Sequence, residues 1–198
     1  MFITFEGIDG SGKSTQARLL ADRLRADGRD VVATREPGGT DLGERLRNVI
    51  LGGETMAPWA ETALFAAARA QLVTEVIRPA LERGADVVCD RYLDSSLAYQ
   101  GLARGLGVER VLEVNLLVTS GLLPDRTFFI AVPPAQAAMR RGDAPDRIER
   151  EGDDFAAKVD AAYRELAAIF AQRIVTLDGA KSQAELAEEV HGQLRDVS

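Results

Sequence analysis

Five short runs of consecutive apolar residues recur along the chain, separated by longer segments with helical periodicity. The runs predict β-strands at residues 2–6, 30–34, 86–90, 127–132 and 173–177. Strands that are apolar at consecutive positions, rather than at alternate ones, are buried on both faces, as the strands of a parallel sheet are. The pattern therefore favours a buried parallel sheet.

The segments between these strands carry apolar residues three and four positions apart, which is the spacing of one helical face. The first of them shows this at Ala17, Leu20, Ala21 and Leu24. We predict helices at 13–26, 42–51, 95–103, 109–120, 135–141, 155–170 and 183–194, and a long one that opens at Pro58 and has Pro79 near its end. This alternation predicts a three-layer α/β fold, with helices on both faces of a five-stranded parallel sheet. The length suits one domain, residues 1–198.

The segment after the first strand has the pattern of a phosphate-binding loop. Residues 7–14 match G-x-x-x-x-G-K-[ST], between a strand and an amphipathic helix as the motif requires. We predict that Lys13 reaches the β- and γ-phosphates of a nucleotide and that Ser14 ligates Mg²⁺. The predicted nucleotide-binding residues are Gly7, Ile8, Asp9, Gly10, Ser11, Gly12, Lys13, Ser14 and Thr15. The motif places the fold in the P-loop NTPase class; the alternative is a glycine-rich turn that matches by chance.

Asp9 is unusual in such a loop, because it puts a carboxylate where anions bind. At about 5 Å and an effective dielectric near 20, it would repel a phosphate charge by roughly 3 kcal/mol. One interpretation is a purely structural acceptor that fixes the loop backbone.

Motifs that the sequence lacks narrow the reaction. The N-K-x-D motif with which GTPases read guanine does not occur, nor does the additional early lysine of partitioning ATPases. The chain is also short for most motor ATPase domains. A kinase that transfers phosphate to a small acceptor fits best.

Two arginines lie at the ends of predicted strands, where ligands bind in doubly wound sheets. Arg35 follows strand 30–34 and Arg91 follows strand 86–90, and a guanidinium at either place can hold a phosphate bidentately. Asp90 ends its strand and could orient Mg²⁺ or its waters. The alternatives are a surface arginine beside a Pro-Gly-Gly turn for Arg35, and a helix N-cap or a partner of an arginine for Asp90.

Phe65 and Arg69 lie one turn apart on the long helix and could stack on a base and bond its edge. Their spacing alone favours a plainer interpretation, in which Phe65 belongs to the core and Arg69 is solvated.

Residues 140–152 mix glycine, proline and charges, which predicts an exposed and mobile lid. Arginines of such a lid would stabilise charge on a transferred phosphate and exclude water. The segment carries Arg140, Arg141, Arg147 and Arg150. The alternative is a solvated loop whose charge is balanced by Asp143, Asp146, Glu149 and Glu151.

Composition excludes several other classes. The net charge of −7 argues against a broad nucleic-acid or membrane surface, and no apolar run approaches 18 residues. Met1 leads directly into the first strand, so we expect no signal peptide. The single Cys89 excludes an internal disulfide, and the single His191 excludes a histidine-rich metal site. A cytoplasmic protein that binds neither nucleic acid nor membrane is expected.

The residues then resemble those of bacterial thymidylate kinases, within the nucleoside monophosphate kinases. The resemblance rests on FEGIDGSGKSTQ, TREPGGT, LFAAARAQ, DRYLDSSLAYQG, LLPDRTFFI and DRIE, in that order over nearly the whole chain. It implies transfer of the γ-phosphate of ATP to dTMP with Mg²⁺, a five-stranded parallel sheet and a homodimer. There are two competing hypotheses: another nucleoside or nucleoside-monophosphate kinase, and an inert nucleotide-binding module.

The resemblance also implies residue roles. Arg35 and Arg91 are similar to clamps on the dTMP phosphate, and Asp9 to a residue that accepts a hydrogen bond from the 3′-hydroxyl. Gly10 stands where one type of the family has a catalytic arginine, so this chain is similar to the type that supplies it from the lid, as Arg141 or Arg147. The nucleoside contacts implied are Pro37, Phe65, Arg69, Ser96, Tyr99 and Gln100, with Arg140 or Arg141 and the backbone of 178–180 near the adenine.

Overall fold

The computed structural model describes residues 1–53, 55–140 and 145–194, and its centre is a parallel five-stranded sheet. The strands are β1 (Phe2–Glu6), β2 (Val31–Arg35), β3 (Asp86–Asp90), β4 (Arg126–Ala131) and β5 (Ile174–Asp178). They lie in the order β2-β3-β1-β4-β5. The predicted parallel sheet is confirmed, with each strand boundary within one residue of its predicted place.

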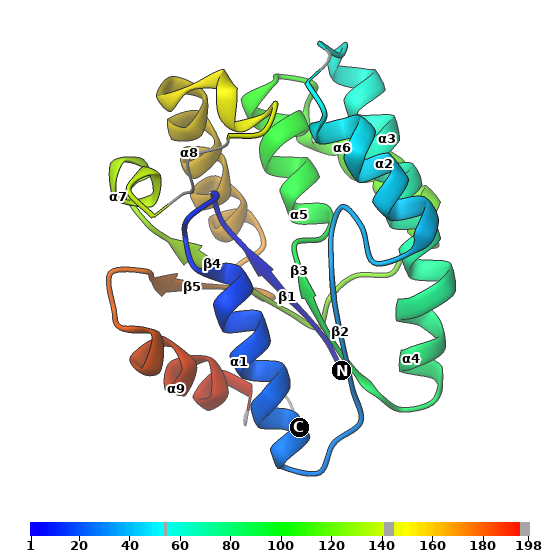
Figure 1. The fold of residues 1–198 in the computed structure, drawn as a ribbon, viewed down its shortest axis with the longest axis vertical. Helices are drawn as coiled ribbons and strands as arrows, with labels where there is room; N and C mark the ends of the chain where they lie inside the picture. Colours follow the sequence, from blue (N-terminus) through cyan, green and yellow to red (C-terminus); the bar gives the residue numbers. More distant parts are fainter. Residues whose placement is uncertain (54, 141–144, 195–198) are drawn as a thin grey trace.

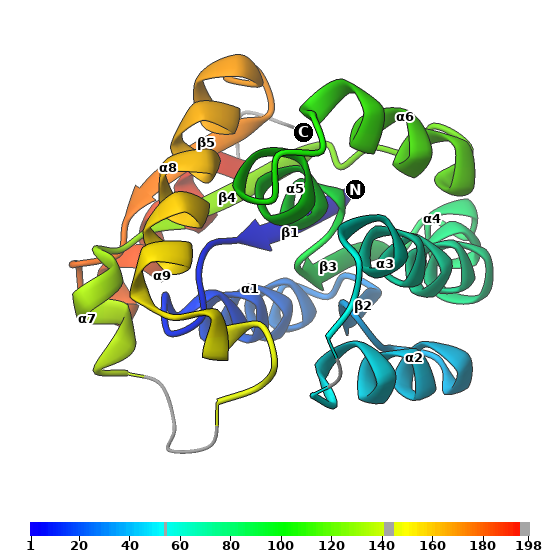
Figure 2. The same ribbon diagram turned by 90° about the horizontal axis from the view of Figure 1, so that it is seen from above.

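Helices cover both faces of this sheet, as predicted (Figures 1 and 2). The helices α1 (Lys13–Ala26) and α9 (Gln183–Leu194) lie on one face, and α4 (Arg78–Glu82), α5 (Leu93–Ser96) and α8 (Asp153–Ile169) lie on the other. The pair α2 (Asp41–Leu51) and α3 (Pro58–Leu72) packs together, and α6 (Val108–Thr119) packs on α3. Two further short elements are α7 (Pro134–Ala138) and the 3₁₀ turn η3 (Glu149–Glu151).

The long helix predicted from Pro58 onward is interrupted. It consists of α3, a π-helical segment η1 (Val73–Ile77) and α4, with Pro79 in the first turn of α4. A proline has no N–H and collides with the carbonyl four residues earlier, so the wider π-helical turn accommodates Pro79. A second π-helical segment, η2 (Leu97–Ala103), continues α5, where a single helix at 95–103 was predicted.

The core fills the space between the sheet and its helices. The rings of Phe5 and Phe128, on adjacent strands, have centroids 5.4 Å apart and are fully buried, and each such side chain stabilises the fold by about 1.5–3 kcal/mol. No helix within the described ranges combines the length and the apolarity needed to cross a membrane.

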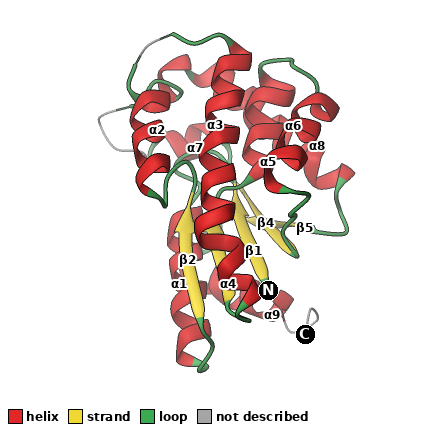
Figure 3. Ribbon diagram, turned by 90° about the vertical axis from the view of Figure 1, so that its right-hand side faces the viewer, coloured by secondary structure: helices red, strands yellow, loops and turns green. Residues whose placement is uncertain are grey.

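The strand register positions the functional residues. Asp90 at the end of β3 pairs with Phe5 of β1 and with Arg35 of β2. Because parallel strands end at the same edge, the loop after β1 and the residues that end β2 and β3 converge there. In Figure 3 the strands point toward the end of the molecule where α2 and α3 lie.

Candidate active site

The loop at residues 7–14 curves tightly against α7. Gly10 has φ 85°, and a Cβ at this position would lie 2.2 Å from the carbonyl oxygen of Ala137. Only glycine fits such a position without displacing the backbone. With α7 where it is, the loop has no room for an arginine at position 10.

Lys13 folds back onto this loop. Its Nζ donates to the Ile8 carbonyl at 3.3 Å and to Asp9 Oδ1 at 3.0 Å. Burial and the charge of Arg91 lower the pKa of Lys13, while Asp9 opposes the shift. Lys13 is the first residue of α1, where the positive end of the helix dipole adds to the positive charge of its side chain.

Asp9 is paired with two cations. Besides Lys13, Arg91 Nη2 donates to Asp9 Oδ1 at 2.6 Å. Burial alone would raise the pKa of Asp9, but Arg91 and Lys13 hold it well below its usual range. The positive charges of Arg91 and Lys13 offset the repulsion between the Asp9 carboxylate and a bound phosphate that we expected from the sequence.

Ser14 and Asp90, the two residues predicted to hold Mg²⁺, contact each other. The Ser14 hydroxyl donates to Asp90 Oδ2. The other oxygen, Asp90 Oδ1, is buried and has no hydrogen-bond partner among the described residues. A hydroxyl beside an unsatisfied carboxylate oxygen fits Mg²⁺, which prefers oxygen ligands.

A pocket of about 500 Å³, partly open to solvent, adjoins this loop and is called here the main pocket. It contains seven of the residues predicted to bind substrate: Asp9, Pro37, Phe65, Arg91, Ser96, Tyr99 and Gln100. It is also lined by six residues that the sequence did not single out for this role: Glu36, Arg47, Leu51, Ser95, Asp146 and Ile148.

Of these six, Arg47 illustrates why they were missed. It lies on α2, where its Nη1 donates to the Pro37 carbonyl at 3.0 Å. In the sequence it is one of two arginines on an amphipathic helix, so no local feature distinguishes it. Ser95 could have been found, because it precedes Ser96 in the same quoted motif.

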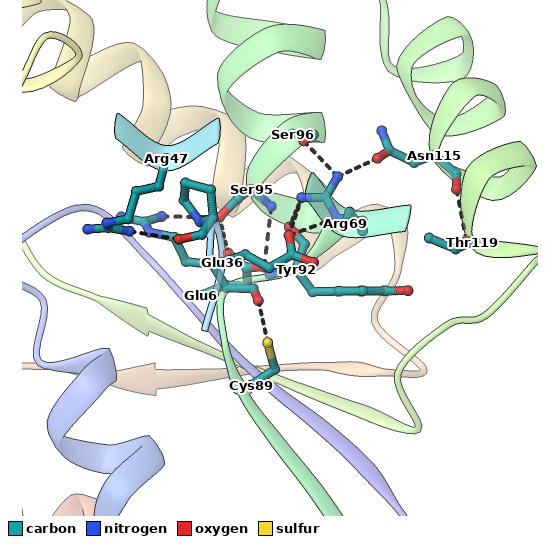
Figure 4. Close-up of polar contacts among 12 residues, drawn as sticks. Glu6, Glu36, Arg47, Arg69, Cys89, Tyr92, Ser95, Ser96, Asn115 and Thr119 are labelled. Carbon is teal, nitrogen blue, oxygen red and sulfur yellow. Dashed lines mark hydrogen bonds and ion pairs between the residues drawn. The ribbon is translucent and has the colours of Figure 1, made fainter. Parts of the chain in front are cut away.

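Arg69 is fully buried, so the interpretation as a solvated residue is wrong. Its guanidinium contacts two residues that line the main pocket, Glu36 and Ser96 (Figure 4). Its Nε and Nη2 contact Glu36 Oε2 at 2.8 and 2.5 Å. Nη2 also donates to the Tyr92 carbonyl at 3.1 Å, and Nη1 donates to Ser96 Oγ at 3.0 Å and to Asn115. All three nitrogens of the guanidinium thus have protein partners, and Arg69 acts on the pocket through Glu36 and Ser96.

Arg35 does not face the main pocket. Its Nη2 contacts both oxygens of Glu44, at 3.1 and 3.0 Å, and the side chain is half exposed. It lines a separate groove together with Ser14 and Asp90. Arg91 alone of the two predicted phosphate clamps therefore reaches the main pocket in this conformation.

The described part of the predicted lid is held to α2 and α3. Arg147 Nε donates to the Ile50 carbonyl at 2.8 Å, and Nη2 donates to Glu61 Oε2 at 2.6 Å. Its guanidinium is thus directed at Glu61 and not at Lys13. Arg140 contacts the Gly179 carbonyl at 3.3 Å, beside the segment predicted for the adenine, and exposed Arg150 bonds the Pro145 carbonyl. Arg141 lies outside the described residues.

Known proteins match this chain in sequence and in structure. Residues 5–190 match the sequence profile of the family described as thymidylate kinase. The thymidylate kinase of Caldanaerobacter subterraneus is 48% identical over 90% of this chain and 86% of its own, and that of Bifidobacterium longum is 44% identical over 100% and 98%. The crystal structure of the Ehrlichia chaffeensis thymidylate kinase superposes with a TM-score of 0.82, at 34% identity and 98% coverage of both chains.

Proposed function

Since the chain belongs to the thymidylate kinase family, we propose how its residues divide the work of that reaction. The enzyme phosphorylates dTMP to dTDP, with ATP as phosphoryl donor. The observation that carries the division of roles is the main pocket, where Asp9 of the phosphate-binding loop and Arg91 share a cavity with the ring of Phe65.

In this proposal the main pocket binds dTMP. Arg91 holds its phosphate, Phe65 stacks on thymine, and Ser96 and Gln100 bond the base edge. Tyr99 lies against the deoxyribose, and Asp9 accepts a hydrogen bond from the 3′-hydroxyl. Arg69 contributes by fixing Ser96 and Glu36, and Arg35 joins Arg91 on the phosphate when its guanidinium leaves Glu44.

ATP is proposed to lie on the other side of the same loop. The backbone N–H groups of residues 7–14 and Lys13 hold its phosphates, with Arg140 near the adenine. Ser14 and Asp90 would hold Mg²⁺, which neutralises charge on the β- and γ-phosphates when it is bound. A phosphate oxygen of dTMP then attacks the γ-phosphorus, and the bond to the leaving ADP breaks.

The lid is proposed to supply the cation that the loop lacks at Gly10. Arg147 bonds Glu61 in the present conformation, so Arg141 is the simpler residue to test. We expect Arg141→Ala to slow transfer by about 10²–10³-fold, with little change in ATP binding, by analogy with lost oxyanion donors. Unchanged turnover would exclude Arg141 from this role.

We also propose a homodimer that works in the cytoplasm, where its charged nucleotide substrates are. Support for the dimer comes from exposed apolar side chains on three helices that pack in series: Leu42 and Val49 on α2, Trp59 on α3 and Leu117 on α6. Light scattering on the purified protein tests the dimer, and a mass equal to one chain would exclude it.

A substrate panel tests the main assignment. ADP production from ATP is measured with dTMP, dUMP, UMP, CMP, AMP and thymidine as acceptors. We expect dTMP to exceed every other acceptor by more than about tenfold in kcat/KM, a discrimination within reach of a few pocket contacts. A smaller ratio would favour another nucleotide kinase, and no ADP with any acceptor would favour an inert binding module.

A further inference from the structure

Glu6, the last residue of β1, is fully buried and accepts four hydrogen bonds. Its Oε1 accepts from the backbone N–H groups of Tyr92 at 2.8 Å and Ser95 at 3.3 Å. Its Oε2 accepts from the hydroxyls of Ser95 at 2.6 Å and Tyr163 at 2.9 Å. Figure 4 shows Glu6 beside Ser95 and Tyr92. One carboxylate thus ties the end of β1 to α5, to α8 and to the residue after Arg91.

The same two hydroxyls hold the guanidinium of Arg91. Arg91 Nη1 donates to Ser95 Oγ at 3.1 Å and to Tyr163 Oη at 3.2 Å, and the two hydroxyl oxygens are 2.9 Å apart. A hydroxyl has one proton and two lone pairs. Because Glu6 takes the protons, the lone pairs remain for Arg91. Glu6 therefore sets the direction in which both hydroxyls accept.

The backbone of Arg91 also depends on this arrangement. Arg91 has φ 71°, in the left-handed region that a residue other than glycine adopts at a cost of about 1–2 kcal/mol. Its N–H donates to the Phe5 carbonyl at 2.9 Å, and Cys89 Sγ donates to its carbonyl at 3.0 Å. Strained residues persist where their surroundings determine them, and the bond from Tyr92 N–H to Glu6 fixes the next peptide.

We propose that Glu6 is a positioning residue for the acceptor phosphate, which aims the Arg91 guanidinium into the main pocket through Ser95 and Tyr163. The proposal rests on the proposed role of Arg91 as the dTMP phosphate clamp. Glu6 is fully buried and bonds Ser95, which lines the main pocket, so it acts on the substrate only through these partners. A purely structural anchor would support phosphate and nucleoside binding alike, whereas a positioning residue affects the phosphate alone.

Calorimetric binding of dTMP and of thymidine, which lacks the phosphate, separates the two roles when it is measured at about pH 8, where the Glu6 carboxylate is charged. The variants are Glu6→Gln and Tyr163→Phe, the second of which keeps the ring stacked on Phe129 at 5.3 Å. The matched control is Tyr92→Phe, which removes a buried hydroxyl that bonds the Leu122 carbonyl at 3.2 Å instead of Arg91.

We expect both variants to weaken dTMP binding about tenfold and to leave thymidine binding within about twofold, since a hydrogen bond to a charged group contributes at least about that factor. Tyr92→Phe should change neither affinity. Equal weakening of both ligands, or unchanged dTMP binding in Tyr163→Phe, would overturn the proposal; Tyr163→Phe decides alone if Glu6→Gln does not fold. If the wild-type protein binds dTMP no more tightly than thymidine, Arg91 is not a phosphate clamp. That result would refute the proposed function of the main pocket itself, and not only the role of Glu6.

Discussion

Replacing Glu61 by glutamine tests how firmly the lid is held to α3. Glu61 is buried in the first turn of α3. Its Oε1 accepts from Gln100 Nε2 and from Arg104 Nε, both at 2.7 Å, and its Oε2 accepts from Arg104 Nη2 at 3.0 Å and from Arg147 Nη2 at 2.6 Å. Glutamine keeps the shape of the side chain, but it removes the anion that pairs with Arg147, leaves Arg104 paired with Glu151 only, and turns an amide N–H toward one of the two guanidinium groups.

The cost follows from the burial of the three groups. Removing one partner of a buried ion pair costs about 3–5 kcal/mol. The side chains of Arg104 and Arg147 are 14% and 8% exposed, so water reaches them in part, and we expect the lower end, about 3 kcal/mol. Burial would raise the pKa of Glu61, but hydrogen bonds from Arg104, Gln100 and Arg147 hold it below its ordinary value, so the carboxylate is charged at neutral pH.

Urea unfolding at neutral pH measures this loss. The control is Glu189→Gln, because Glu189 pairs with Lys181 at 2.8 Å on the surface, where ion pairs contribute less than about 1 kcal/mol. A loss for Glu61→Gln no larger than that of the control would show that the Arg104–Glu61–Arg147 cluster does not stabilise the fold.

Three further outcomes are expected. Gly10→Ala should lower stability by at least about 1–2 kcal/mol from the left-handed backbone alone, and weaken ATP binding, because its Cβ would meet the Ala137 carbonyl; unchanged unfolding and ATP titrations would contradict this. Burial, helped by the nearby Asp94 and opposed by Arg91, raises the pKa of Glu6 from 4.5 to about 7. The folded protein therefore binds this proton more tightly than the unfolded chain does, which stabilises the fold at low pH. This stabilisation is lost as the pH rises through about 7. Relative to Glu6→Gln, the wild type should therefore lose roughly 2–3 kcal/mol of unfolding free energy between pH 5 and 8, and parallel urea series in which the difference stays constant would refute it. Asp9→Asn should reduce turnover of dTMP more than that of its 3′-deoxy analogue, whereas equal losses would favour a structural role for Asp9.

The resemblance to thymidylate kinases supplied five residues of the main pocket: Pro37, Phe65, Ser96, Tyr99 and Gln100. Local sequence predicted the strands, the phosphate-binding loop and Arg91. Each of these follows from neighbours in the chain: β1 from its apolar run, the loop from its glycines and Lys13, and Arg91 from its place after β3. The parallel register then brings them together, because strands of one direction end at one edge.

The directions of the arginine side chains could not be predicted in this way. Arg69 is buried because Glu36 from the end of β2 and Asn115 from α6 meet it, and these partners are 33 and 46 positions away. Arg35 turns away from the main pocket because Glu44 holds it, and Arg147 turns away from Lys13 because Glu61 holds it. A carboxylate between 9 and 86 positions away decides each case, and periodicity carries no information on it.

The π-helical segment η2 has a consequence for comparing this chain with its relatives. A π-helical turn holds about one residue more than an α-helical turn, and η2 carries both Tyr99 and Gln100 into the main pocket. Deleting one residue from η2 would restore an ordinary helix, but it would rotate the side chains that follow by about 100° about the axis. A single-residue gap at this point of an alignment therefore indicates that different side chains face the nucleotide, even where the two chains are otherwise identical in sequence.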